Sequence, residues 1–261
     1  MKEINELALD DYSVYYEKTE YPENPEEPVL IFLHDSWGCV GMWGDFPEKL
    51  MKIAGLNAFV YDRRGYGRSS PFGTAQRDKN YLHQEAGELI RVMDKANIRK
   101  AVLYGHSDGA TIALIAAAKY PERIVAVIAE STHTFIEEKG KTAVLESRER
   151  AKHNSLLQTL EKYHGDKTGE LFRRWHETWL SDNFADWSII PLLCDIQCPV
   201  LAFRGKDDPY DSIEQQNVLK SEMSSPLTTA VIPDAGHSPR IDNETVTMKL
   251  IKSFLSCNSF E

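Results

Sequence analysis

The stretch AVLYGHSDGATIALIAAA, residues 101–118, joins a short apolar run to a longer one through a turn that holds Ser107 between Gly105 and Gly109. The first run has the length and side chains of a buried strand, and the second is apolar on nearly every side, as a buried helix is. Glycines on both sides of a serine let helix and strand nearly touch at a strained turn. A helix that begins at Asp108 would direct free N–H groups at the space above Ser107. The stretch therefore predicts a nucleophilic serine beside a site for developing negative charge.

A Gly-x-Ser-x-Gly motif arises by chance in about one chain in twenty of this composition, so the rest of the sequence must support it. Short apolar runs, typical of strands buried on both faces, recur at residues 29–33, 56–61, 101–104, 124–129, 200–203 and 229–232. Helical patterns alternate with them at residues 46–53, 81–96, 110–119, 212–223 and 243–255. This alternation predicts an α/β fold with a mostly parallel central sheet flanked by helices. Residues 5–19 alternate polar and apolar side chains and predict an antiparallel hairpin at the sheet edge.

One segment, from Thr134 to Leu193, interrupts this alternation with charged amphipathic stretches and no strand signal. We expect residues 134–193 to form a helical cap over a core built from residues 1–133 and 194–261. The segment is rich in aromatic residues: Phe172, Trp175, Trp179, Phe184 and Trp187. Any one of them is expected to fix the cap to the core, and as a group they are expected to wall an apolar pocket.

Composition narrows the class of protein. A chain of 261 residues with 42% hydrophobic and 27% charged residues is ordinary for a folded soluble protein. A formal net charge of -10, without a basic run, argues against nucleic acid and anionic membranes as partners. The first residues, MKEINELALDD, lack the features of a signal peptide, so a cytoplasmic location is expected. The sequence indicates no oligomeric state.

Four cysteines in a chain of this length do not make a disulfide framework. Cys194 and Cys198 have no neighbouring histidine that would complete a metal site. We therefore expect neither a metal nor an organic cofactor.

A serine nucleophile needs a base, and the base needs a carboxylate that orients it. His237 lies in a glycine-containing loop between a predicted strand and a predicted helix, at the sheet edge where parallel sheets bind ligands. Asp207, Asp208 and Asp211 share the turn after the preceding strand. The order serine, acid, histidine is the one expected for a serine on such a turn.

The remaining histidines are weaker candidates for the base. His133 follows the predicted strand at residues 124–129 and is the second choice, because it could face the pocket. His106 lies within the serine turn and is expected to be structural or to line the pocket, and His34 is expected to hydrogen-bond a loop. The others fall in surface helical patterns: His83, His153, His164 and His176.

Four motifs in this order resemble the α/β-hydrolase family over almost the whole chain. LYGHSDGA resembles its nucleophile elbow, YDRRGYGRSS its Asp-x-Arg-Gly loop, RGKDDPYD its acid turn and DAGHSPR its Gly-His loop. The resemblance implies a catalytic triad of Ser107, Asp208 and His237, with Asp207 a loop residue. A less common arrangement in the family would take the acid from Glu130. The arginines Arg63, Arg64 and Arg68 could bind an acidic substrate, but they are expected to fix turns.

The loop after the first buried strand reads Leu33-His34-Asp35-Ser36-Trp37, where the family usually has a glycine in place of Asp35. By position, the backbone N–H groups of Ser36 and Asp108 should form the oxyanion hole, or that of Trp37 if the loop is displaced. A carboxylate here would oppose an oxyanion unless its side chain is paired or points away.

The resemblance implies a serine hydrolase that cleaves a small to medium apolar carboxylic ester or related acyl substrate through an acyl-enzyme. Trp37, His106, His133, Trp175 and Trp179 are the candidate pocket residues. Carbon–carbon bond hydrolases, thioesterases, amidases and perhydrolases share the same triad, and some members of the fold only bind ligands. Members that use an aspartate nucleophile, such as epoxide hydrolases and haloalkane dehalogenases, fit less well because this chain has a serine there.

Overall fold

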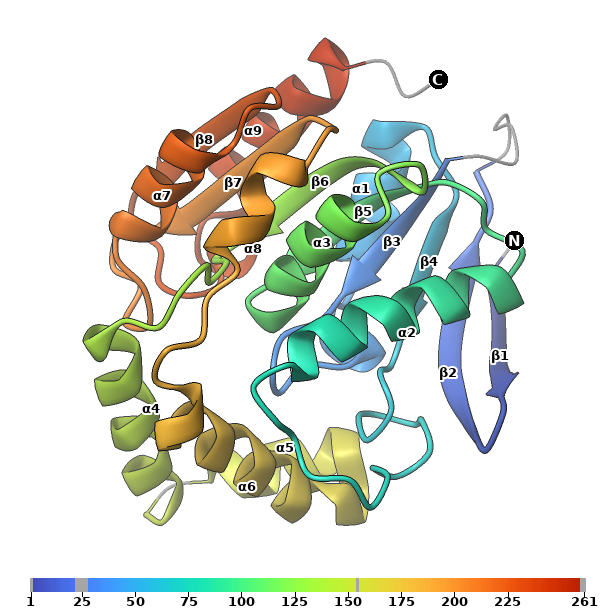
Figure 1. The fold of residues 1–261 in the computed structure, drawn as a ribbon. Helices are drawn as coiled ribbons and strands as arrows, with labels where there is room; N and C mark the ends of the chain where they lie inside the picture. Colours follow the sequence, from blue (N-terminus) through green and yellow to red (C-terminus); the bar gives the residue numbers. More distant parts are fainter. Residues whose placement is uncertain (1, 22–27, 154, 259–261) are drawn as a thin grey trace.

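The computed structural model describes residues 2–21, 28–153 and 155–258. Its centre is an eight-stranded sheet in the order β1-β2-β4-β3-β5-β6-β7-β8. The strands are β1 (Lys2–Leu9), β2 (Tyr12–Thr19), β3 (Val29–Leu33), β4 (Ala58–Tyr61), β5 (Ala101–His106), β6 (Ile124–Glu130), β7 (Val200–Gly205) and β8 (Leu227–Ile232). All pairs from β4 to β8 are parallel, whereas β2 is antiparallel to both β1 and β4. The predicted parallel sheet with an edge hairpin is confirmed (Figure 1).

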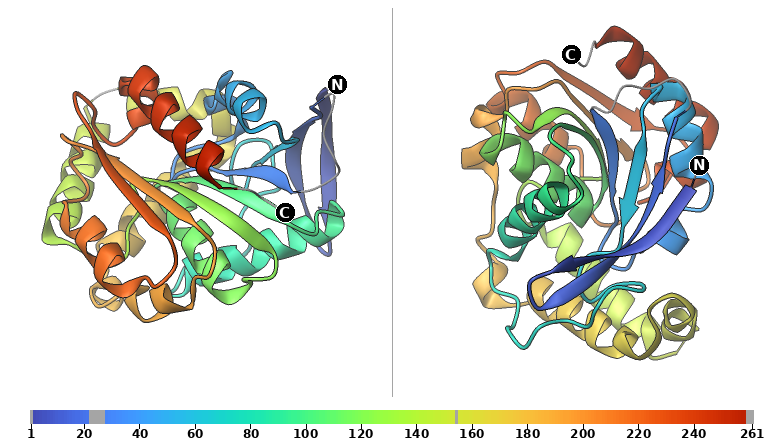
Figure 2. Two further views of the ribbon diagram at one scale, coloured as in Figure 1. Left: turned by 90° about the horizontal axis from the view of Figure 1, so that it is seen from above. Right: turned by 90° about the vertical axis from the view of Figure 1, so that its right-hand side faces the viewer.

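Helices cover both faces of the sheet, as the apolar character of β3, β5 and β6 requires. Viewed from above in Figure 2, α1 (Phe46–Ala54) and α9 (Glu244–Cys257) lie on one face, and α2 (Tyr81–Lys95) and α3 (Asp108–Lys119) lie on the other. The short helix α7 (Glu214–Glu222) packs beside β8 on the α3 face. The fold is therefore a three-layer α/β sandwich with two apolar cores, one on each side of the sheet.

The helix expected at residues 243–255 is α9. A separate turn, α8 (Pro239–Asp242), which the sequence pattern did not predict, precedes it. Asn243 ends α8 and caps α9, since its side chain accepts a hydrogen bond from the Val246 N–H.

Between β6 and β7 the chain leaves the sheet and forms α4 (Glu138–Ala151), α5 (Leu156–His164) and α6 (Thr168–Trp179), followed by the 3-10 turn Ile190–Asp195. We call residues 134–193 the inserted segment. Its three α-helices gather beyond the carboxyl ends of the strands (Figure 1). Among the described residues, none of the helices has the length and apolar character to cross a bilayer.

The inserted segment contacts the core through hydrogen bonds to loop backbone. His164 donates from Nε2 to the Trp37 carbonyl at 2.7 Å and accepts at Nδ1 from the Gly67 N–H at 2.9 Å. Lys167 donates from Nζ to the carbonyls of Gly67 and Ser69, each at 2.7 Å. These bonds fix α5 and the start of α6 against two loops that leave the sheet at the same edge.

The serine turn depends on two close backbone approaches. A Cβ added at Gly105 would lie 2.5 Å from the Ala110 Cα and closer still to the Gly109 carbonyl. A Cβ at Gly109 would overlap the Leu33 carbonyl. Only glycine at these positions lets α3 approach β5 and β3 as closely as it does.

We therefore expect Gly105→Ala to lower the free energy of unfolding by about 1–3 kcal/mol or more, because the added methyl overlaps backbone that cannot rotate away. Gly169→Ala is the matched control. Gly169 lies in the first turn of α6 with no atom within 4 Å of an added Cβ, so its variant should be as stable as wild type or about 0.5–1 kcal/mol more stable. Urea unfolding followed by circular dichroism measures both, and equal stability of Gly105→Ala and wild type would contradict this account of the turn.

Candidate active site

Ser107 lies between the end of β5 and the start of α3 with φ 55° and ψ -119°. This positive φ is unfavourable for a residue with a Cβ, and the surrounding bonds hold it. The Ser107 N–H donates to the Glu130 carbonyl at 2.9 Å, and its own carbonyl accepts from the N–H groups of Ala110 and Thr111. The strained turn points the Ser107 hydroxyl out of the sheet edge and into a cavity.

His237 and Asp208 meet Ser107 from two further loops. The Ser107 Oγ lies 3.0 Å from His237 Nε2, and His237 Nδ1 lies 2.8 Å and 3.0 Å from the two oxygens of Asp208. Asp208 follows β7 and His237 follows β8, so neighbouring strands deliver both groups. An ionised carboxylate only accepts, so Nδ1 carries the proton and Nε2 is left to accept the serine proton. The sequence predicted these three residues as partners, and the structure brings them together in that order.

The electrostatics suit this arrangement. Burial alone would raise the pKa of Asp208, but the charge of His237 and its hydrogen bond to the carboxylate lower that pKa well below its ordinary value. Burial alone would lower the pKa of His237, but Asp208 outweighs it and raises that pKa above 6.5. The pair therefore favours an imidazolium once His237 has taken a proton.

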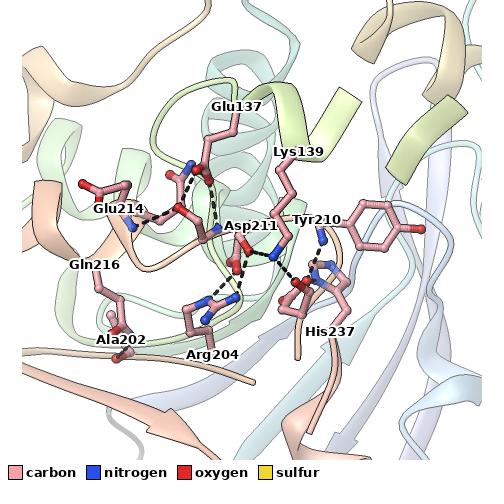
Figure 3. Close-up of polar contacts among 12 residues, drawn as sticks. Glu137, Lys139, Ala202, Arg204, Tyr210, Asp211, Glu214, Gln216 and His237 are labelled. Atoms are coloured by element: carbon pink, nitrogen blue, oxygen red, sulfur yellow. Dashed lines mark hydrogen bonds and ion pairs between the residues drawn. The ribbon is translucent and has the colours of Figure 1, made fainter. Parts of the chain in front are cut away.

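The inserted segment helps to hold the turn that carries Asp208 (Figure 3). Lys139, in the first turn of α4, donates from Nζ to the carbonyls of Asp208 at 2.6 Å and Asp211 at 2.7 Å. Arg204 donates from Nε to the Asp211 carboxylate at 2.6 Å. Within the turn, Asp208 Oδ1 also accepts from the Tyr210 N–H at 2.9 Å. The acid is thus fixed by both the core and α4.

Two backbone N–H groups near Ser107, those of Asp108 and Ser36, are the candidate oxyanion donors. The Asp108 N–H belongs to the first turn of α3, where helical N–H groups have no intrahelical acceptor. Ser36 lines the same cavity as Ser107. The Trp37 N–H, the alternative donor, already donates to Asp35 Oδ1 at 2.7 Å. The geometry therefore favours Ser36 and Asp108 over Trp37.

The structure shows how Asp35 is accommodated beside this site. Its Oδ1 accepts from the Trp37 N–H, and its Oδ2 lies 3.1 Å from His106 Nδ1. Burial alone would raise the pKa of Asp35, but His106 and these hydrogen bonds lower it well below its ordinary value. The carboxylate is therefore paired, as the sequence required if it was to be tolerated.

The cavity above Ser107 has a volume of about 450 Å³, part of which is open to solvent. It is lined by residues of the core and of the inserted segment: Asp35, Ser36, Trp37, Ser107, His133, Gly140, Val144, Trp175, Trp179, Tyr210 and His237. Four of the five expected pocket residues, Trp37, His133, Trp175 and Trp179, line it. His106 does not, because its ring contacts Asp35 and the His237 carbonyl. Its place among the expected pocket residues is wrong, and the structural role that was its other expectation fits these contacts.

His133 also approaches the serine, and its ring packs against the His237 ring with centroids 5.9 Å apart. Its Nε2 is 3.4 Å from the Ser107 Oγ, and its ring packs edge-on against Trp179. Burial, aided by the charge of His237, lowers the pKa of His133 to about 4. Among the described residues no carboxylate contacts this ring, so His133 lacks the orienting acid that His237 has.

The other candidate acids are occupied elsewhere. Glu130 accepts from the Tyr104 hydroxyl and from both the backbone and the guanidinium of Arg240, at 2.7–2.8 Å. Asp207 is exposed, and Asp211 pairs with Arg204. These contacts leave Asp208 as the carboxylate bonded to His237.

The loop arginines fix turns, as expected. Arg63 donates to the carbonyls of His34 and Asp35, and Arg64 donates to the Pro71 carbonyl. Arg68 donates to the Tyr15 hydroxyl. None of the three lines the cavity above Ser107.

Sequence reasoning missed Lys139, Gly140, Val144 and Tyr210. The first three lie in the first two turns of α4. The sequence there is rich in charged residues and gives no sign that the helix contacts the acid turn. Tyr210 packs on the His237 ring with centroids 4.7 Å apart. In the sequence, only its position in the acid motif, two residues after Asp208, could have indicated that Tyr210 lies at the site.

Solved structures with this fold include enzymes of several kinds. An enol-lactonase from Burkholderia xenovorans superposes with a TM-score of 0.72 at 20% identity, covering 97% of this chain and all of that one. A structure from a study of carboxylesterases of Nitrososphaera gargenis gives a TM-score of 0.74 at 21% identity, with 97% and 98% coverage. At these identities the likeness shows the fold alone.

Sequence relatives are also hydrolases. The human serine hydrolase BPHL is 30% identical over 160 residues, which cover 58% of this chain and 53% of that protein. The chain matches only about half of the length of such relatives. The 2-(acetamidomethylene)succinate hydrolase of Mesorhizobium japonicum is 25% identical over 258 residues, 89% of this chain and 90% of that protein.

The family model described as "Alpha/beta hydrolase family" matches residues 30–247, a span that contains β3 to β8 and all three residues of the serine, histidine and aspartate cluster. Together with the sheet order, this match shows that the chain belongs to the α/β-hydrolase superfamily.

Proposed function

We propose that this chain is a serine hydrolase that cleaves a neutral, apolar carboxylic ester or lactone through an acyl-enzyme. The observation that carries the proposal is the continuous hydrogen-bonded series from the Ser107 Oγ through His237 to Asp208, opening into an aromatic cavity. Carboxylesterase activity is the reaction this arrangement fits best.

In this mechanism the Ser107 Oγ attacks the acyl carbonyl while His237 Nε2 takes its proton. The N–H groups of Ser36 and Asp108 stabilise the oxyanion, and Asp208 stabilises the imidazolium. The imidazolium returns the proton to the leaving alkoxide, which departs as an alcohol and leaves the acyl group on Ser107. His237 then takes a proton from a water molecule as that water attacks the ester carbon. The imidazolium returns the proton to the Ser107 Oγ as the acyl C–O bond breaks, which releases the acid and the free serine.

The walls of the cavity argue for a neutral substrate. They are mainly aromatic and aliphatic, and none of the described lining residues is a lysine or arginine. The lining carboxylate, Asp35, is already bonded to His106 and to the Trp37 N–H. A substrate carboxylate, such as the name of the Mesorhizobium relative implies, would be buried here without a cationic partner. The inserted segment acts as a cap that closes the cavity around the acyl part.

Removal of the nucleophile or the base is expected to abolish most of the activity. Ser107→Ala should lose hydrolysis of p-nitrophenyl butyrate and labelling by a fluorophosphonate, and His237→Gln should lower kcat about 10²–10⁴-fold. His83→Gln, on α2 and outside the site, is the control and should retain wild-type rates. Full activity in Ser107→Ala would rule out the proposed mechanism.

The pH profile follows from the raised pKa of His237. Below that pKa the ring is an imidazolium and cannot accept the serine proton, so kcat/KM should fall toward acid pH with a midpoint above 6.5. Asp208→Asn removes the charge that stabilises the imidazolium, so it should move the midpoint to lower pH as well as lower the rate. A midpoint below 6.5 that Asp208→Asn leaves in place would contradict this assignment.

Charge selectivity tests the cavity. Wild type should hydrolyse p-nitrophenyl butyrate at least about ten times faster, in kcat/KM, than p-nitrophenyl hemisuccinate, because only the second buries an unpaired carboxylate. Val144→Arg places a cation on the α4 wall and should raise the relative rate on the hemisuccinate, whereas Val144→Met, which adds length without charge, should not. Equal rates on both esters in wild type would argue against a neutral acyl group.

A further inference from the structure

Both ring nitrogens of His106 face hydrogen-bond acceptors. Nδ1 lies 3.1 Å from the Asp35 carboxylate and Nε2 lies 2.8 Å from the backbone carbonyl of His237. The side chain is 3% exposed, so water does not compete for either nitrogen. One residue of the serine turn thus touches both the loop after β3 and the loop after β8.

Neither acceptor can donate a hydrogen bond in return. A backbone carbonyl has no proton to give. The Asp35 carboxyl is ionised at pH 7, since an aspartate has an ordinary pKa of about 4 and this one also accepts from the Trp37 N–H. A neutral imidazole has a single N–H, so it would turn a lone pair toward one of the two oxygens. Only a ring protonated at both nitrogens satisfies both contacts.

We propose that His106 is held as an imidazolium that bridges Asp35 and the His237 carbonyl, and so positions the oxyanion loop and the catalytic histidine loop against Ser107. The proposal rests on the proposed function, since the groups it positions are those of the serine hydrolase site. His106 touches no reacting atom, and its role is that of a positioning residue.

The buried charges around His106 balance when it is a cation. Asp35 contacts it directly. Burial alone would raise the pKa of Glu130, at the end of β6, but the charge of Arg240 outweighs burial and lowers that pKa. Arg240 of α8 pairs with Glu130 at 2.7 Å and also attracts Asp35. The two anions, Asp35 and Glu130, are balanced by two cations, Arg240 and His106, only if His106 is protonated. An unbalanced charge in this largely buried cluster would be costly.

The remaining titratable groups near this cluster do not replace that cation. The His237 ring lies 5.1 Å from the His106 ring, centroid to centroid, and is paired with Asp208. Burial, with Arg63 nearby, holds the pKa of His34 well below its ordinary value, which keeps that ring neutral. Arg63 donates to the Asp35 carbonyl, and its own charge is attracted by Glu85 and Asp108.

The bridge has a consequence for activity at alkaline pH. Asp35 precedes Ser36, whose N–H is the proposed oxyanion donor, and it also fixes the Trp37 N–H. When His106 loses a proton, one of its contacts becomes repulsive and the two loops are no longer held together. We expect kcat to fall about tenfold or more on the alkaline side, since each contact is a charge-assisted hydrogen bond.

Nitrogen-15 NMR of the histidine-labelled protein tests the charge state without any turnover. At pH 7 the resonances of His106, assigned by their loss in His106→Asn, should show protons on both ring nitrogens. A single ring proton on His106 would overturn the proposal, even if esters are hydrolysed. If the protein neither hydrolyses esters nor reacts with a fluorophosphonate, the proposed function fails separately, because the NMR result does not depend on activity.

The Asp35→Asn variant tests whether His106 positions the two loops through its charge or only through its shape. The amide can accept from the Trp37 N–H and donate to Nδ1 of a neutral His106, so the second ring proton and the alkaline fall in kcat should both disappear. Asp207→Asn removes the same charge from an exposed position and should keep both. An alkaline fall unchanged in Asp35→Asn would contradict the proposal, and the wild-type NMR result decides if that variant does not fold.

Discussion

The backbone of Ser107, held at a positive φ where β5 becomes α3, is the constraint on which the rest of the site depends. That conformation exists because Gly105 and Gly109 allow backbone to pack on backbone at the turn. It lifts the hydroxyl out of the sheet edge and aligns the first N–H groups of α3 beside it. In the proposed mechanism, the same geometry supplies the attacking atom and part of the oxyanion hole.

Around this turn, three loops and two strand ends at the carboxyl edge of the sheet are joined by ionic contacts that are largely buried. His237 pairs with Asp208, Arg240 with Glu130, and His106 with Asp35. Each pair joins groups carried by different loops or strand ends, so the contacts set the relative positions of those segments. Buried pairs of this kind add little net stability, but they fix geometry because leaving one partner unpaired is costly.

Much of the fold could be read from the sequence, because short apolar runs and amphipathic helices have distinct periods. The strands from β3 to β8 and the antiparallel hairpin appear where the pattern placed them. Ser107, His237 and an acid turn were identifiable because each follows a strand, and strand ends converge at one sheet edge. The choice of Asp208 within that turn came from the resemblance to the α/β-hydrolase family. The helix at residues 243–255 was predicted correctly. The short helix before it, α8, was not predicted, because four residues that begin with a proline show no helical periodicity.

The rest of the site depends on side-chain directions that a sequence does not encode locally. His106 follows a strand residue and was expected to be structural or to face the pocket, yet its ring points to Asp35, 71 residues earlier in the chain. Lys139 and Tyr210 contribute because α4 packs on the acid turn, a contact between segments that no local pattern links. The pairing of Asp35 likewise became visible only when three distant loops were placed together.

In the proposed mechanism Ser107 is the nucleophile and the N–H groups of Ser36 and Asp108 receive the oxyanion. A crystal structure of the protein after reaction with a fluorophosphonate should therefore show phosphorus bonded to the Ser107 Oγ, with the phosphoryl oxygen within hydrogen-bond distance of both N–H groups. An adduct on another side chain, or a phosphoryl oxygen directed away from Ser36 and Asp108, would contradict it.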